Sequence, residues 1–282
     1  MATMRLLLLS ALLIFSPVHA VVIIVHGSFS TTKAWWKPGG DFFDAVEKEA
    51  KTLGHAVVPF GWSGVPQDKE ITSAGAVLAK LAMSYPVAER IFMIGHSHGG
   101  NVIHKATHYL HAQRTSSPGR DNTWPHIQAQ DLVPTTKTNS DGSIDRGNVE
   151  KILPPKRCLI DRIYLLGTPV SVSQYFPHLD IVDKVINLYS SGDLVQTVLG
   201  SFARHYPLSE HIANVEVFYD HGKGASSCGH SQLHDALMGR WLLYMPDLLA
   251  HANIGNFNRF VYNKHGHVVI RPHRHPVYGL FV

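Results

Sequence analysis

The strongest constraint on the fold is the regular alternation of short apolar runs with segments of helical periodicity. Six runs rich in Val, Ile and Leu are predicted to be strands: Val21–His26, His55–Phe60, Arg90–Gly95, Ile160–Gly167, Lys184–Ser190 and Val215–Asp220. The first of them, VVIIV, is apolar at every position, which is typical of a strand covered on both faces. The sequence therefore predicts a doubly wound α/β domain with a mostly parallel, six-stranded sheet.

The segments between these runs have the apolar spacing of helices that pack one face against a sheet. Four helices are predicted, at Asp41–Thr52, Ile71–Met83, Asn101–Gln113 and Ser231–Leu249. With 45% hydrophobic residues among 282, the chain is expected to be globular, neither disordered nor membrane-spanning. The net charge of +4 comes without a dense run of Lys and Arg, so no nucleic-acid partner is expected.

Residues 1–20 have the three parts of a secretory signal: one early positive charge, an apolar run and a small residue at a cleavage site after Ala20. The apolar run is too short to span a bilayer, although a buried N-terminal helix is an alternative. A secreted or periplasmic location is therefore predicted. Cys158 and Cys228 are expected at opposite ends of the sheet, about 20 Å apart. A disulfide requires Cα atoms within about 7 Å, so both thiols are expected to be unpaired.

Two segments depart from the alternation. Arg114–Lys156 is polar and too long for an ordinary connection. A lid is one interpretation, but the preceding helix runs away from the sheet edge where a site is expected, which favours a surface excursion. Residues 251–282 are predicted to be a C-terminal appendage, in which Phe257–Tyr262 and His267–Arg271 pair as a hairpin around Asn263–Gly266.

The sequence GHSHG at residues 95–99 matches the pattern G-x-S-x-G in the context that this pattern requires. It follows a predicted buried strand and opens a predicted helix, so the turn would lift Ser97 above the sheet edge. The glycines have a physical role, because side chains at positions 95 and 99 would crowd such a tight turn. Ser97 is therefore predicted to be a nucleophile.

A serine hydroxyl needs a base to remove its proton and a third group to orient that base. The base is predicted to be His230, which follows the last predicted strand and opens the final helix. His234 and His221 are competitors, but His234 lies a helical turn further on and His221 lies too near the strand end.

The orienting acid is predicted to be Asp193, three residues after the fifth predicted strand and next to a glycine that permits the turn. Asp220 is the rival, whereas Asp180 and Asp183 precede that strand and would lie at the wrong end of the sheet. Asp193 also suits the N-cap of a following helix, a role compatible with catalysis.

Attack on a carbonyl creates an oxyanion that needs N–H donors already in place. The predicted donors are the backbone N–H groups of Ser28 and His98, with Phe29 as the alternative to Ser28. Loops at the carboxyl ends of strands are expected to line the substrate site. The apolar candidates there are Phe29, Trp35, Trp36, Trp62, Val170, Tyr175 and Phe176. They suit an apolar acyl group, although several equally suit packing within the loops.

The segments VIIVHG, IGHSHGGN, LLGTPVS, LYSSGDLV and GHSQL resemble the α/β-hydrolase superfamily, in particular its compact bacterial lipases and esterases. The resemblance covers residues 21–250, with serine, acid and histidine in the order of that family. It implies a hydrolase domain that lacks the two leading strands of larger members. It also implies hydrolysis of a small-molecule or lipid ester through an acyl-enzyme, with no metal or organic cofactor. The polar insertion and the tail depart from the minimal pattern.

Other classes of function fit the sequence less well. A thioesterase or acyltransferase would use the same acyl-enzyme. A non-catalytic binding protein on this scaffold would not need all three catalytic groups, and no obligate protein partner is evident.

Three H-x-H pairs raise the possibility of zinc: His96 with His98, His265 with His267, and His273 with His275. The first pair flanks a turn and the tail pairs lack nearby carboxylates or thiolates, so no metal site is expected. The tail is expected to be a solvated surface, which protonation near pH 6 would make more favourable for contact with anionic membrane surfaces.

Overall fold

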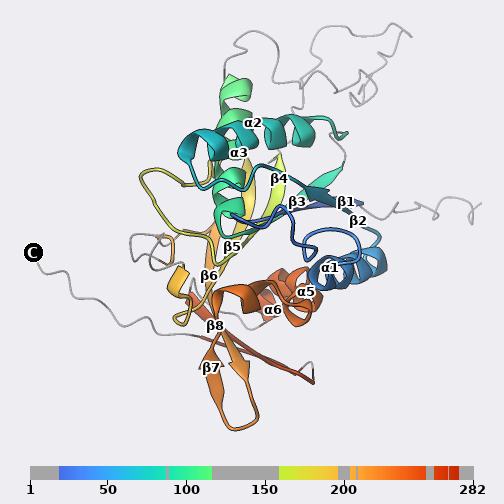
Figure 1. Ribbon diagram of the computed structural model, residues 1–282, viewed down its shortest axis with the longest axis vertical. Coiled ribbons are helices and arrows are strands. Elements are labelled where there is room, and N and C mark those ends of the chain that lie inside the picture. The colour runs from blue at the N-terminus through green and yellow to red at the C-terminus, as the bar shows by residue number, and fades with distance from the viewer. Residues whose placement is uncertain are drawn as a thin grey trace, which may run out of the picture.

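The computed structural model describes residues 19–86, 89–115, 159–195, 204–207, 209–251, 257–265 and 267–272. They form one mixed, mostly parallel sheet with helices on both faces, as the predicted α/β class requires (Figure 1). Most of the predicted signal segment, nearly all of the polar insertion, Cys158 and the end of the tail lie outside the described residues. Cys228 is buried and forms no disulfide with any other described residue.

The six predicted strands are present, with ends that differ from the prediction by at most three residues. They are β1 (Ala20–Val25), β2 (Ala56–Phe60), β3 (Arg90–His96), β4 (Ile160–Leu166), β5 (Val182–Tyr189) and β6 (Ile212–Asp220). The sheet order is β2-β1-β3-β4-β5-β6-β8-β9, and neighbours from β2 through β8 are parallel. Parallel strands bring their carboxyl ends to one edge of the sheet, where the predicted site residues follow.

The described residues form nine strands of this sheet, so the prediction of six is wrong. The additional strands are β7 (Ala225–Ser227), β8 (Phe257–Asn263) and β9 (Val268–Pro272). The predicted tail hairpin exists as the antiparallel pair β8 and β9, and β8 also pairs in parallel with β6. The hairpin thereby covers the backbone edge that β6 would otherwise expose. Periodicity within the tail does not reveal this pairing with a distant strand.

Three of the predicted helices are present, as α1 (Asp41–Thr52), α2 (Asp68–Met83) and α3 (His98–Thr115). The fourth is divided into η2 (His230–His234), α5 (Ala236–Leu242) and α6 (Met245–His251). Asp235 causes the first break, because its side chain accepts a hydrogen bond from the N–H of Met238 at 2.7 Å and starts a new helix. A proline in the first turn of α6 suits a second helix start.

The helices form two layers, with α2 and α3 on one face of the sheet and α1, α5 and α6 on the other (Figure 1). β1 contributes to both cores, because successive side chains of a strand point to opposite faces. Ile23 packs with Leu78 and Ile103 of the α2 and α3 layer, whereas Ile24 packs with Phe42 of α1. Each such buried side chain contributes about 1.5–3 kcal/mol to folding. No helix among the described residues has both the length and the apolar content to cross a bilayer.

Candidate active site

Ser97 occupies the turn between β3 and α3 in a conformation that side chains rarely adopt. Its φ angle is +53°, in the left-handed region, where a non-glycine residue is strained. Its N–H donates to the carbonyl of Leu166 at 2.9 Å, and its own carbonyl accepts from Gly100 at 3.0 Å. A Cβ atom at Gly99 would overlap the carbonyl oxygen of Val25. The glycine therefore lets α3 start directly against the end of β1, which fixes the strained turn.

Asp193 and His230 meet at the same edge of the sheet, although they are far apart in the sequence. Nδ1 of His230 lies 2.7 Å from Oδ2 of Asp193 and donates to it. This bond assigns the ring proton to Nδ1 and leaves Nε2 as the atom that can accept a proton. Asp193 has no exposed surface, whereas the side chain of His230 remains 17% exposed.

Gly167, at the end of β4, is a site residue that the sequence analysis missed. Its φ angle is +58°, and a Cβ atom there would lie 2.7 Å from Oδ2 of Asp193 and 3.2 Å from Nδ1 of His230. Only glycine combines this backbone conformation with the close approach to the pair. The signal available in the sequence was its place directly after a predicted strand, in LLGTP.

The competing acids and bases have other partners. Asp220 accepts the N–H of Gly222 at 2.8 Å, and His221 lies 2.9 Å from the hydroxyl of Ser226, both within the β6–β7 hairpin. Asp180 lies beside His178, at 2.8 Å. Asp220, His221 and Asp180 thus have contacts of their own, away from the hydrogen bond between Asp193 and His230.

Two further histidines pack beside His230. The ring of His96 lies 4.5 Å from that of His230, and the ring of His234 lies 4.3 Å from that of His96. His234 also stacks on Trp35 at 4.2 Å. Burial disfavours a charged ring, so it lowers the pKa of His234 to about 4 and holds the pKa of His96 well below its usual value. Both rings are therefore neutral at pH 7.

The predicted oxyanion donors lie on two loops that touch. The hydroxyl of Ser28 lies 3.0 Å from Nδ1 of His98. Over the described ranges, no hydrogen bond uses the backbone N–H of either residue. The N–H of Phe29, by contrast, donates to the carbonyl of Gly64 at 3.0 Å, which removes Phe29 as the alternative donor.

His26 is a second residue that sequence reasoning did not assign. Trp62 donates its backbone N–H to Nε2 of His26 at 3.2 Å and its indole N–H to the His26 carbonyl at 2.7 Å. Nδ1 of His26 therefore carries the proton and donates to the carbonyl of Gly27 at 2.7 Å. Burial lowers the pKa of His26, so this neutral tautomer persists at pH 7. The ring thus fixes the loop that carries Ser28.

The residues predicted to contact substrate differ in exposure. Phe29 is 78% exposed, and Trp35 is partly buried against His234. Trp36 and Trp62 are buried and each packs against the ring of His26. The other three pack inward: Val170, Tyr175, whose hydroxyl donates to Asp68 at 2.9 Å, and Phe176. Contact of any of them with a substrate stays a prediction.

The two histidines of the first H-x-H pair face different neighbours. His96 faces His230 and His234 while His98 faces Ser28, and His273 and His275 lie outside the described residues. Among the described residues, side chains able to share a metal ion come together at His111, His178 and Asp180. These lie in the second half of α3 and after β4, away from Ser97.

No protein-family model matches the chain, and no curated protein matches its sequence. One solved structure that resembles it is the crystal structure of a metagenomic carboxyl esterase, with 9% identity and a TM-score of 0.34. The alignment covers 73% of this chain and 51% of that one, so the chain spans about half the length of the structure that it matches. A likeness this distant assigns no activity.

Proposed function

We propose that the protein is a serine hydrolase of carboxylic esters, built on the α/β-hydrolase plan, with Ser97, His230 and Asp193 as its catalytic triad. The observation that carries this proposal is the 2.7 Å hydrogen bond between His230 and the fully buried Asp193. It lies at the sheet edge to which the strained turn of Ser97 also belongs. A buried carboxylate on Nδ1 is the arrangement that makes an imidazole a general base.

In the proposed reaction, Oγ of Ser97 attacks the ester carbonyl carbon while Nε2 of His230 takes the hydroxyl proton. The backbone N–H groups of Ser28 and His98 donate to the oxyanion that forms. The proton then passes from His230 to the leaving alkoxide, and an acyl-enzyme remains on Ser97. His230 then deprotonates a water molecule that attacks this ester, and as the bond to Oγ breaks the proton passes from His230 to Oγ of Ser97 and the carboxylic acid leaves. Asp193 holds the ring orientation and stabilises the imidazolium in both steps.

The neutral rings of His96 and His234 support this role for His230. A charged imidazole beside His230 would oppose the imidazolium that forms during the reaction. Because burial keeps both neighbours uncharged at pH 7, His230 can take up a proton next to them without repulsion between like charges.

The proposed substrate is an ester with an apolar acyl group. Phe29, which is 78% exposed, follows the proposed oxyanion donor Ser28 directly in the chain. A thioesterase or acyltransferase would use the same groups, and the choice between these activities rests on the acyl donor and acceptor. Export, supported by residues 1–20, would direct the enzyme to substrates outside the cytoplasm.

The test is labelling with a fluorophosphonate probe, followed by mass spectrometry of the adduct. We expect one adduct on Ser97, lost in Ser97→Ala and retained in Ser84→Ala, a matched change at the exposed end of α2. A folded protein without a Ser97-dependent adduct would contradict the proposal. Nitrophenyl esters of increasing chain length, compared with acyl-CoA, then separate ester from thioester specificity.

A further inference from the structure

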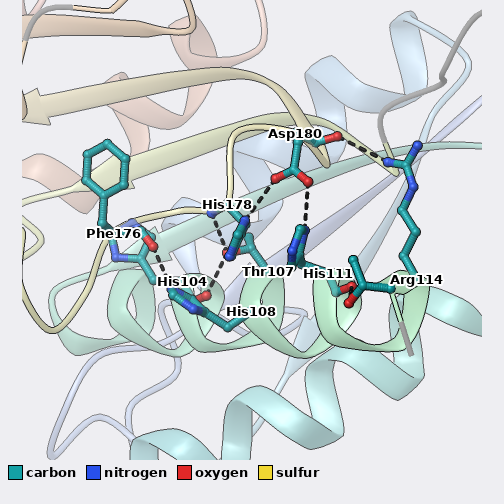
Figure 2. Close-up of polar contacts among 9 residues, drawn as sticks. His104, Thr107, His108, His111, Arg114, Phe176, His178 and Asp180 are labelled. Atoms are coloured by element: carbon teal, nitrogen blue, oxygen red, sulfur yellow. Dashed lines mark hydrogen bonds and ion pairs between the residues drawn. The ribbon is translucent and has the colours of Figure 1, made fainter. Parts of the chain in front are cut away.

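A second group of histidines lies on the half of α3 distant from Ser97. His111 of α3 and His178 of the segment after β4 both face the carboxylate of Asp180 (Figure 2). The nitrogen and oxygen atoms that these three side chains offer all lie within 4.8 Å of one another. No step of the proposed ester hydrolysis uses them.

The contacts in this group leave one buried atom without a hydrogen bond. Nδ1 of His178 lies 2.8 Å from Oδ1 of Asp180 and is hydrogen-bonded to it. Nδ1 of His111 lies 2.7 Å from Oδ2 of the same carboxylate, but the alignment is not that of a hydrogen bond. The two imidazole rings are stacked, with centroids 3.7 Å apart and planes 9° from parallel. Nδ1 of His111 is therefore a buried polar atom that lies beside the carboxylate but forms no hydrogen bond.

The backbone around the group is fixed from outside it. The hydroxyl of Thr107 accepts the N–H of His178 at 3.0 Å, and Arg114 donates to the carbonyl oxygen of Asp180 at 3.2 Å (Figure 2). One helical turn before His111, Nε2 of His108 lies 2.7 Å from the carbonyl oxygen of Phe176. These contacts attach the segment to α3 through main-chain atoms, and the carboxylate stays turned toward the imidazoles.

We propose that His111, His178 and Asp180 bind one divalent cation of the zinc class. Imidazole nitrogen and carboxylate oxygen are ligands of Zn²⁺ at about 2.0–2.2 Å. In a tetrahedral site such ligands are about 3.4 Å apart. This spacing falls between the present contacts of 2.7 and 2.8 Å and the 4.8 Å within which all three ligand atoms lie. The lone pair of an imidazole nitrogen lies in its ring plane, so the two stacked rings would rotate apart for both to bind the cation. Water would take the fourth position, and Mg²⁺ and Ca²⁺ would bind poorly because they prefer oxygen ligands.

The bound cation would act on stability instead of ester hydrolysis. His111 lies 13 positions after the first residue of α3, which corresponds to about 20 Å along the helix axis. A cation there would link α3 to the segment between β4 and β5, since His111 belongs to the helix and the other two ligands belong to the segment. Because unfolding separates the ligands, a cation bound only by the folded state raises the melting temperature.

The test uses the full chain after treatment with a chelator, titrated with ZnCl2 alone. We expect one bound equivalent by equilibrium dialysis and a rise in Tm of about 5–10 °C at a zinc concentration 100 times Kd. His111→Gln, His178→Gln and Asp180→Asn should each weaken binding at least tenfold. The matched control is His265→Gln with His267→Gln, an exposed histidine pair, which should retain the equivalent. Circular dichroism checks that each variant is folded.

A measurement on the unmodified protein keeps the proposal testable if a variant misfolds. Zn²⁺ should protect His111 and His178 from diethyl pyrocarbonate, as mapped by mass spectrometry, while His221 is still modified. Ser97→Ala should bind zinc like the wild type, so failure of the hydrolase proposal leaves this result unaffected. The proposal is overturned if all three single variants keep the equivalent, if protection falls on other histidines, or if MgCl2 gives the same Tm shift.

Discussion

Two regions of the molecule set imidazole against a carboxylate at 2.7 Å, and they differ in burial and in the number of imidazoles. At the first, Asp193 is fully buried and faces His230. At the second, Asp180 is 35% exposed and faces both His111 and His178. One buried carboxylate on one imidazole orients a base, whereas one accessible carboxylate between two imidazoles has the composition of a cation site. The two proposals thus give the same residue types different roles because their surroundings differ.

The largest expected effect separates the two regions by activity. Ser97→Ala should lower kcat for ester hydrolysis about 10⁴–10⁶-fold, because the nucleophile is removed. Steady-state kinetics with a nitrophenyl ester measures the change, and Ser84→Ala serves as the control. If Ser97→Ala retained even a tenth of the activity, the first region would lose its assigned role.

The next effect tests whether the buried side chain at position 193 must be a carboxylate. Asp193→Asn should lower kcat about 10⁴-fold, because the amide no longer selects the tautomer of His230 that accepts a proton at Nε2. The protein should stay folded, since the amide has the shape of the carboxylate. The exposed Asp183 provides the control, as Asp183→Asn, and near-normal activity of Asp193→Asn would transfer the role of the acid to Asp220.

A smaller effect concerns the pH dependence of stability in the first region. The pKa of His234 is lowered to about 4 by burial, below the value near 6.5 of an unfolded histidine. As the pH falls below 6.5 the unfolded chain therefore binds a proton that folded His234 excludes. The free energy of unfolding should drop by about 1–2 kcal/mol between pH 7 and pH 5 from this group.

Denaturant unfolding at several pH values measures this loss. His234→Gln should flatten the dependence between pH 7 and pH 5, since it removes the titrating ring. An equally steep dependence in the variant would show that other groups, such as the buried His96, account for the loss of stability.

The smallest expected effect is on substrate affinity. Phe29→Ala should raise KM for long-chain esters about fivefold and leave short-chain esters almost unchanged, because an exposed ring contributes about 1 kcal/mol of apolar contact. Tm should not change, since Phe29 is largely exposed. An equal change for acetate and long-chain esters would remove Phe29 from the acyl-binding surface.

The local parts of this structure could be predicted from the sequence. Strand and helix positions follow from apolar periodicity, and Ser97 and Asp193 follow parallel strands at their carboxyl ends. His230 follows the short antiparallel strand β7, which the sequence analysis did not predict. The sequence analysis predicted one helix over 231–249, whereas the structure has separate helices there. The side chain of Asp235 accepts the N–H of Met238 and starts a new helix, an effect that apolar periodicity does not reveal.

The features that the sequence analysis did not predict depend on contacts between distant parts of the chain. Gly167 is required by the position of Asp193, which another strand supplies. The group of His111, His178 and Asp180 draws on α3 and on the segment after β4, so a search for H-x-H spacing could not find it. The pairing of β8 with β6 likewise depends on the backbone edge of β6, which the sequence of the tail does not contain.

The central place of β1 has a consequence for the order of synthesis. Val21 pairs with Ala56 on one side and Ile91 on the other, and both partners come later in the chain. At 5–20 residues per second, the ribosome reaches Ile91 about 4–14 s after Val21. VVIIV, which has no charge or proline, therefore has two open backbone edges until Ala56 is made and one until Ile91 is made, and other chains can pair with them. A strand that is buried along its whole length in the finished sheet thus keeps an open edge while 70 further residues are made.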